Sequence, residues 1–162
     1  MITSLTVDDL TGADGAALLA LNNAHALELS WLEPERLAHL VGEAFVARRV
    51  AVADALLLTF DQAADYDSVN YLWFRERYPT FVYVDRVVVA DGARGRGLAR
   101  RLYDDLFAAA KAAGHQRIVC EVNSDPPNPA SDAFHAALGF VAVGVAEIHG
   151  GKKTVTYLER AL

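Results

Sequence analysis

Cysteine is almost absent from the sequence, which has a single one, Cys120, among its 162 residues. A lone cysteine excludes an intramolecular disulfide and a zinc site built from several cysteine ligands. Cys120 lies within the apolar run of residues 117–122, so it is expected to be a small buried side chain. The sequence therefore predicts no disulfide framework and no metal site.

Long apolar runs are missing as well. No stretch approaches the roughly 18 apolar residues of a membrane-spanning helix. The first residues show no basic segment followed by an apolar core, which is the pattern of a secretory signal. We therefore expect a cytoplasmic protein that has no membrane partner.

Basic residues are outnumbered, since 15 lysines and arginines face 21 aspartates and glutamates, for a formal net charge of −6. Nucleic-acid-binding proteins normally carry a basic patch, so no nucleic-acid partner is expected. The acidic balance suits a small cationic substrate. A length of 162 residues is enough for one well-buried domain and short for two, so residues 1–162 are expected to form a single domain.

Apolar spacing predicts alternating strands and helices. The predicted strands span residues 2–7, 45–52, 55–60, 81–89, 117–123, 140–148 and 154–158. The predicted helices cover residues 10–21 (interrupted by Asn22 and Asn23), 34–41, 98–113 and 129–138. Residues 61–80 crowd aromatic side chains among turn formers and are predicted to be irregular. This order indicates one mixed α/β domain.

A basic stretch with two glycines, residues 94–99, joins the strand at 81–89 to the helix at 98–113. Glycine lets the backbone approach a ligand closely, and the first N–H groups of a helix lack partners within that helix. The helix dipole favours an anion there, and Arg94 and Arg96 can add charge-assisted contacts. A solvated charged turn is the alternative. The stretch predicts a site for a pyrophosphate.

Two motifs in this chain resemble the signatures of the GCN5-related N-acetyltransferase (GNAT) superfamily. Residues 94–99 match the pattern (Gln or Arg)-x-x-Gly-x-(Gly or Ala) at Arg94, Gly97 and Ala99. Residues 128–140 match the second signature, in which an asparagine precedes a helix that ends in an aromatic residue, three further residues and Gly-Phe. Residues 66–74, 83–86 and 121–129 also resemble motifs of a bacterial subfamily of predicted acetyltransferases.

The resemblance implies an α/β (α+β) fold with a mixed, mostly antiparallel central sheet flanked by helices. It implies a V-shaped splay between the strands near residues 81–89 and 117–123, which would hold acetyl-CoA, the acyl donor. The pantetheine arm would pair with the first strand, a backbone N–H near Val88 or Val89 would polarise the thioester carbonyl, and residues 94–99 would hold the pyrophosphate. For Asn128, a pure helix-capping role is the alternative. The implied cofactor-binding residues are Val87, Val88, Val89, Arg94, Gly95, Arg96, Gly97, Leu98, Ala99, Asn128 and Phe134.

Two carboxylates compete for the role of general base. An amine with a pKa of roughly 10.4 must lose a proton before it attacks a thioester. Asp85 lies in an apolar strand, where family members often carry a base, and an ion pair is its structural alternative. Because neighbours in a strand point to opposite faces, Arg86 is not expected to be its partner. Glu121, in the adjacent strand, is the competing base or else a surface carboxylate.

His135 departs from the family pattern, which often has a tyrosine at this position to protonate the departing thiolate. An imidazole can also donate a proton or a hydrogen bond. His135 is therefore a candidate catalytic acid, with a structural histidine as the alternative. Tyr103, in the helix at 98–113, is the substitute acid.

The aromatic side chains of residues 66–78 predict the acceptor side of the site. Tyr66, Tyr71, Trp73 and Phe74 could line a pocket or surround a cation, and packing in the core is the alternative. The expected function is transfer of an acetyl group to a primary amine of a small or amino-acid-like acceptor, by direct attack in a ternary complex. A protein N-terminus or lysine as acceptor and a non-catalytic acyl-CoA sensor are the alternatives. The resemblance also implies a homodimer.

Overall fold

The strands form one seven-stranded sheet in the order β1-β2-β3-β4-β5-β7-β6. The computed structural model describes all residues, 1–162. The strands are β1 (Ile2–Ser4), β2 (Val46–Val50), β3 (Ala55–Asp61), β4 (Val82–Val89), β5 (Arg117–Asp125), β6 (Val141–Ile148) and β7 (Lys153–Ala161). All neighbours pair antiparallel except β4 and β5. The mostly antiparallel α/β class predicted from the sequence is confirmed.

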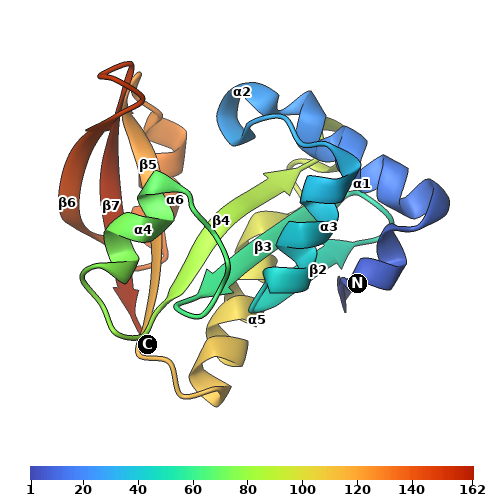
Figure 1. Ribbon diagram of the computed structural model, residues 1–162, viewed down its shortest axis with the longest axis horizontal. Helices are drawn as coiled ribbons and strands as arrows, with labels where there is room; N and C mark the ends of the chain where they lie inside the picture. Colours follow the sequence, from blue (N-terminus) through green and yellow to red (C-terminus); the bar gives the residue numbers. More distant parts are fainter.

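The helices divide between the two faces of this sheet (Figure 1). They are α1 (Gly12–Ala24), α2 (Ala26–Leu29), α3 (Pro34–Glu43), α4 (Val69–Arg75), α5 (Leu98–Ala112) and α6 (Pro129–Ala137), with short 3-10 turns η1 (Val7–Leu10) and η2 (Asp91–Ala93). Apolar side chains of α1, α3 and α4 share one core with Phe60, Tyr83 and Tyr157. Leucines of α5 pack on the opposite face against Val82, Val84 and Ile118. Each face of the sheet therefore has its own core.

The parallel strands β4 and β5 part almost as soon as they meet. Only Val82 pairs with Ile118 and Tyr83 with Val119, after which β4 continues to Val89 without a β5 partner. Figure 1 shows the two strands diverging into a V whose open end lies between α2 and the β6–β7 hairpin. The predicted splay is confirmed, and it leaves one edge of β4 free to pair with a ligand.

A β-bulge in β4 lies directly beyond this parting. Leu58 of β3 faces Arg86 and Thr59 faces Val84, so Asp85 has no partner across the ladder. The extra residue reverses the side-chain alternation. Tyr83 and Val88 therefore share the core that includes α1 and α4, although one position is odd-numbered and the other even.

Two sequence-based predictions of local structure are wrong. Residues 69–75 form the helix α4, although the segment was expected to be irregular, because Tyr71 and Phe74 at helical spacing are both buried in the core. Asn22 and Asn23 lie within α1 and do not interrupt it. Their polar side chains are satisfied by the loop that follows, which removes the cost of placing them in a helix.

Trp73 of α4 packs against the edge strand β6 at the point where the pairing of β6 with β7 shifts register. Its indole stacks on the ring of Tyr157, with centroids 4.1 Å apart. A Cβ atom at Gly144 would lie 2.5 Å from Trp73 Cζ2. The pairing of β6 with β7 shifts register between Ala142 and Gly144. A glycine is thus required where the helix meets the strand.

Candidate active site

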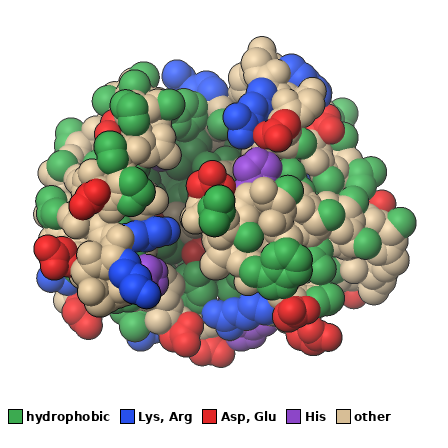
Figure 2. Space-filling model, turned by 90° about the horizontal axis from the view of Figure 1, so that it is seen from above, with side chains coloured by type: hydrophobic (Ala, Val, Ile, Leu, Met, Phe, Trp, Pro, Cys, Tyr) green, Lys and Arg blue, Asp and Glu red, His purple; other side chains and the backbone are tan.

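A cleft of about 470 Å³ opens where β4 and β5 diverge. A second hollow of about 300 Å³ adjoins it, and the two share Glu28, Leu29, Val87 and Asn128 among their lining residues. Figure 2 looks down on the open end of the V and shows the surface hollowed there, with acidic, basic and histidine side chains around the depression. The site is therefore one continuous cleft with two ends.

The glycine turn lies at the end of β4. Gly95 and Gly97 have φ values of 78° and 69°, in the left-handed region that favours glycine. A Cβ atom at either position would meet nothing within 4 Å, so the backbone conformation, not space, requires glycine. Gly97 is the N-cap of α5, and no side chain caps the helix. Its first N–H groups are thus available to an anion, as predicted for a pyrophosphate site.

Both arginines of the turn already have carboxylate partners. Arg94 lies 3.2 Å from Asp91, and Arg96 lies 2.8 Å from Asp54. The two arginine side chains are 65% and 53% exposed, and ion pairs at such positions contribute only about 0.2–1 kcal/mol. A pyrophosphate can therefore compete for these guanidinium groups.

The other residues predicted to hold the cofactor do not all line the cleft. Val87, Val88, Val89, Arg94 and Asn128 line the second hollow together. Leu98 is buried in the core beneath the turn, and Phe134 packs on the ring of Tyr103, so neither side chain lines the cleft. Ala99 follows Leu98 in the first turn of α5, where its backbone N–H is the group that could bind.

Asn128 caps the helix α6, the role that was considered as an alternative to binding the cofactor. Its side-chain oxygen accepts a hydrogen bond from the Ser131 N–H at 3.3 Å, and Pro129 occupies the first helical position. The prediction of an N-cap is confirmed. Because Asn128 also lines both hollows, capping does not remove it from the cleft.

The prediction that Arg86 does not pair with Asp85 is wrong. Arg86 Nε donates to Asp85 Oδ2 at 2.6 Å, and both side chains are only 5% exposed. The bulge explains the contact, because reversed alternation directs two consecutive side chains to the same face of β4. The Tyr66 hydroxyl donates to the other carboxylate oxygen of Asp85. Asp85 is thus a buried carboxylate with its charge paired.

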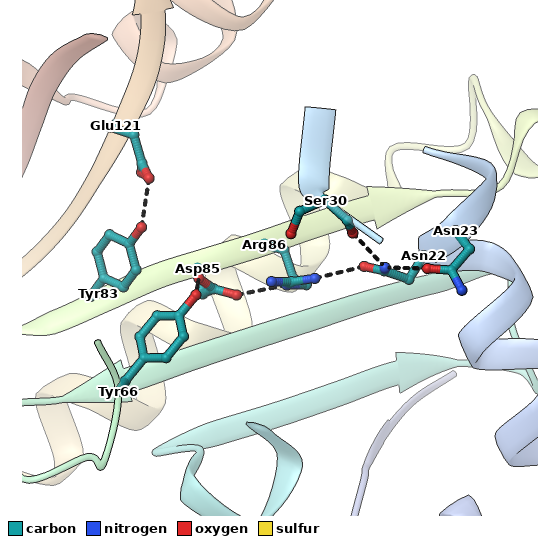
Figure 3. A network of polar contacts seen from close by, with 8 residues as sticks. All are labelled: Asn22, Asn23, Ser30, Tyr66, Tyr83, Asp85, Arg86 and Glu121. Carbon is teal, nitrogen blue, oxygen red and sulfur yellow. Dashed lines mark hydrogen bonds and ion pairs between the residues drawn. The ribbon is translucent and has the colours of Figure 1, made fainter. Parts of the chain in front are cut away.

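Arg86 extends this network to the loop after α1, as Figure 3 shows. Its Nη1 donates to the Asn22 side-chain oxygen at 2.8 Å, and Asn22 donates to Asn23 and to the Ser30 carbonyl. Buried polar groups need such partners, since an unpaired one costs about 1–3 kcal/mol. The network therefore ties one wall of the cleft to β4.

Glu121 is placed differently from Asp85. It lies on β5, half-buried in the cleft, and accepts a hydrogen bond from the Tyr83 hydroxyl at 2.6 Å (Figure 3). Burial raises the pKa of Glu121 from 4.5 to about 7, and the nearby Asp85 charge adds to the rise. No arginine or lysine pairs with it. Glu121 can thus gain or lose a proton near neutral pH.

His135 and Tyr103, the two candidate acids, form a hydrogen-bonded pair. His135 Nδ1 lies 2.8 Å from the Ser131 carbonyl, which can only accept, so we assign the ring proton to Nδ1. Nε2 then accepts from the Tyr103 hydroxyl at 2.9 Å. Burial lowers the pKa of His135, so the imidazole is neutral. Both residues line the cleft beside Cys120.

The aromatic residues predicted to bind the acceptor have unequal places. Tyr66 lines the cleft and is held by its hydrogen bond to Asp85. Tyr71 and Phe74 are 0% exposed in the core, and Trp73 stacks on Tyr157. None of these three lines the cleft, where Val69 and Asn70 of the same helix do. Tyr71, Trp73 and Phe74 therefore pack in the core, which was the alternative to a role in binding the acceptor.

Sequence reasoning missed three basic residues around the wider end of the cleft. Arg36 comes from α3, and His149 and Lys153 come from the β6–β7 hairpin. Only the fold brings these segments together.

No helix of the structure has the length and apolar character needed to cross a membrane.

The family model described as "Acetyltransferase (GNAT) family" matches residues 34–140, which contain both signatures and β4 to α6. The chain belongs to this family. It is therefore an acetyltransferase by family, with the fold of that family. No curated protein matches the sequence.

Solved structures with the same fold cover nearly the whole chain. The ribosomal-protein-S18-alanine N-acetyltransferase from Escherichia coli is 18% identical, with a TM-score of 0.71 over 99% of this chain and 92% of that one. Ard1 from Thermoplasma volcanium is 14% identical, with a TM-score of 0.73 over 100% and 97%. The IAA acetyltransferase from Bacillus cereus is 12% identical, with a TM-score of 0.64 over 100% and 99%. These similarities concern the fold alone.

Proposed function

We propose that this GNAT protein transfers an acetyl group from acetyl-CoA to the primary amine of a small or amino-acid-like acceptor. The observation that carries the proposal is Glu121, a carboxyl without a cationic partner whose pKa is raised to about 7 in the cleft between β4 and β5. A base with such a pKa is well matched to taking a proton from an ammonium group near neutral pH.

The residues of the cleft fit acetyl-CoA as the donor. The free edge of β4 at Val87 to Val89 suits an extended pantetheine arm, and the turn with Gly95 and Gly97 suits its pyrophosphate. When bound, this co-substrate supplies an activated acetyl thioester. The protein residues then need to bind both molecules, orient them, remove protons from the acceptor nitrogen and supply one to the sulfur.

The first proton goes from the acceptor ammonium to Glu121, directly or through water. Tyr83 holds the carboxylate by its hydroxyl and so fixes its orientation. Asp85 does not serve this role in the proposal, because Arg86 neutralises its charge and Tyr66 occupies its second oxygen. Asp85 instead holds Tyr66 and Arg86 in the cleft wall.

After the attack, the Tyr103 hydroxyl of the Tyr103–His135 pair gives its proton to the departing sulfur as the C–S bond breaks. The nitrogen of the new amide releases its excess proton, which returns to the phenol through water. The Tyr103 hydroxyl can turn from His135 Nε2 toward the cleft that both residues line. Burial raises the pKa of Tyr103 well above 10, so the phenol remains protonated as a donor. His135 holds the hydroxyl in place through a ring fixed by Ser131.

A thiol-release screen of amines, amino acids and short peptides with acetyl-CoA tests the proposal. Release with at least one small amine, and its loss in Glu121→Gln, is the expected result. Thermal stabilisation by acetyl-CoA without thiol release from any acceptor would favour a non-catalytic acyl-CoA sensor. Stabilisation by ATP and not by CoA would contradict the donor assignment.

A peptide α-amine is the second candidate acceptor. The similar structures include proteins described as N-acetyltransferases of a ribosomal protein. The exposed Leu27 and Trp31, in and directly after α2, stand near the open end of the V and could contact a peptide. The screen separates the two cases, because a peptide enzyme acetylates a short peptide far faster than its free N-terminal amino acid.

A further inference from the structure

Of the lysine and arginine side chains that line the cleft, only Lys153 has no acidic partner. Arg86 pairs with Asp85 at 2.6 Å, and Arg36 lies 3.4 Å from Asp67. Lys153 also lines the cleft, but no carboxylate comes within 4.0 Å of its ammonium, and it makes no side-chain hydrogen bond. The residue is half-buried.

Lys153 projects from the same face of the sheet as the candidate base. It stands opposite Ile148 across the β6–β7 hairpin, and Ile148 also lines the cleft. Along β7, Lys153, Val155 and Tyr157 share one face by alternation. Tyr157 stands directly opposite Glu121 on β5. Lys153 and Glu121 thus flank one stretch of the cleft wall.

The separation of the two groups suits a short bifunctional molecule. Lys153 is four residues from Tyr157 along β7, and a rise of about 3.4 Å per residue places their Cα atoms ~14 Å apart. The side chains of Lys153 and Glu121 both line the cleft. A short molecule with a charged group at each end can span the distance between Lys153 and Glu121.

The two protein groups, the carboxylate of Glu121 and the ammonium of Lys153, have opposite charges. At the Glu121 end the acceptor presents an ammonium, and the Asp85–Arg86 pair adds no net charge. At the Lys153 end, a fixed positive charge lacks a counter-ion. Charge-assisted hydrogen bonds to a carboxylate are stronger than neutral ones.

We propose that Lys153 binds an anionic group of the acceptor, so that the substrate is an amine that also carries a carboxylate. This inference rests on the proposed function, because it places the amine of the acceptor at Glu121. It assigns an anion subsite at the start of β7, away from the glycine turn. Lys153 determines specificity and takes no part in the proton transfers.

The test compares ω-amino acids of increasing chain length with their uncharged primary amides, each with acetyl-CoA. The expected result is a kcat/KM at least tenfold higher for the acid than for the amide at the best length. Lys153→Met should abolish this preference without changing the Kd of acetyl-CoA, and Lys153→Arg should retain it. Lys152→Met is the matched control, because Lys152 is exposed and does not line the cleft.

Three results would overturn the inference: equal rates for acid and amide, a preference that survives Lys153→Met, or an equal loss of acetyl-CoA affinity in that variant. Calorimetric binding of the same acids and amides to the CoA-loaded protein gives a second readout. Thiol release from no amine at all would contradict the proposed function. A Lys153-dependent binding preference for the acids would still support the anion subsite.

Discussion

Replacement of Glu121 by glutamine should slow acetyl transfer roughly 10²- to 10⁴-fold and make the folded protein more stable at alkaline pH. The pKa of Glu121 rises from 4.5 to about 7 on folding, chiefly because the carboxylate loses water. One pKa unit corresponds to 1.36 kcal/mol, so the ionised side chain destabilises the folded state by about 3 kcal/mol. Glutamine carries no charge and avoids this cost, and its amide oxygen can still accept the Tyr83 hydrogen bond.

The sign of the pH dependence follows from which state holds the proton. Between about pH 4.5 and pH 7 the folded protein retains a proton on Glu121 that the unfolded chain has released. The free energy of unfolding therefore falls as the pH rises through this window, and the full cost is present above pH 7. Wild type and Glu121→Gln should be equally stable near pH 4.5 and differ by about 3 kcal/mol at pH 8.

Urea denaturation of both proteins at pH 5 and pH 8 measures this difference, with kcat/KM followed over the same range. Wild-type kcat/KM should rise through about pH 7 as the base ionises, and loss of a general base lowers it roughly 10²- to 10⁴-fold. Glu76→Gln is the control, since Glu76 is 75% exposed outside the cleft. A stability difference that is the same at both pH values would refute the reasoning.

Three further substitutions test other parts of the cleft and fold. Asp54→Asn removes the partner of Arg96 and should tighten acetyl-CoA binding by roughly twofold to fivefold, measured by calorimetry; a weaker Kd would show that Arg96 does not meet the cofactor. His135→Phe should lower turnover with little change in acetyl-CoA affinity, and unchanged turnover with the best acceptor would show that His135 is not needed to hold the Tyr103 hydroxyl in place. Gly144→Ala forces a Cβ against Trp73 and should lower the free energy of unfolding by about 1–3 kcal/mol in urea, whereas full wild-type stability would mean that the indole moves aside without cost.

The elements around the glycine turn could be predicted because their signals are local. A run of β-branched residues predicts β4, and leucines at helical spacing predict α5. Gly97 lies between the predicted strand and helix, and the structure places it at the N-cap of α5 with a positive φ value. Each signal lies within a few residues of the structure that it specifies.

The helix α4 was missed because its aromatic residues have only moderate helix propensity and follow a turn-rich stretch. Its stability comes from burial of Tyr71 and Phe74 against strands far away in the sequence. The spacing of these two residues was the available signal. Tertiary packing decided the outcome over local propensity.

The site itself depended on contacts that no local pattern contains. Tyr103 and His135 are 32 residues apart and meet only because α5 and α6 share one face of the sheet. Lys153 lines the cleft because the β6–β7 hairpin forms one side of its open end (Figure 1). Residue types therefore predicted the chemistry, whereas the pairing of the groups required the fold.

The bulge at Asp85 links the shape of the cleft to the choice of base. In a regular strand Arg86 would point away from Asp85, and a buried unpaired carboxylate would face the cleft near Glu121. The Asp85 charge already raises the pKa of Glu121, and without Arg86 that repulsion would be stronger. The bulge gives Asp85 its partner directly beyond the point where β4 leaves β5. One extra residue in β4 thus leaves Glu121 as the carboxyl that can exchange a proton where the strands part.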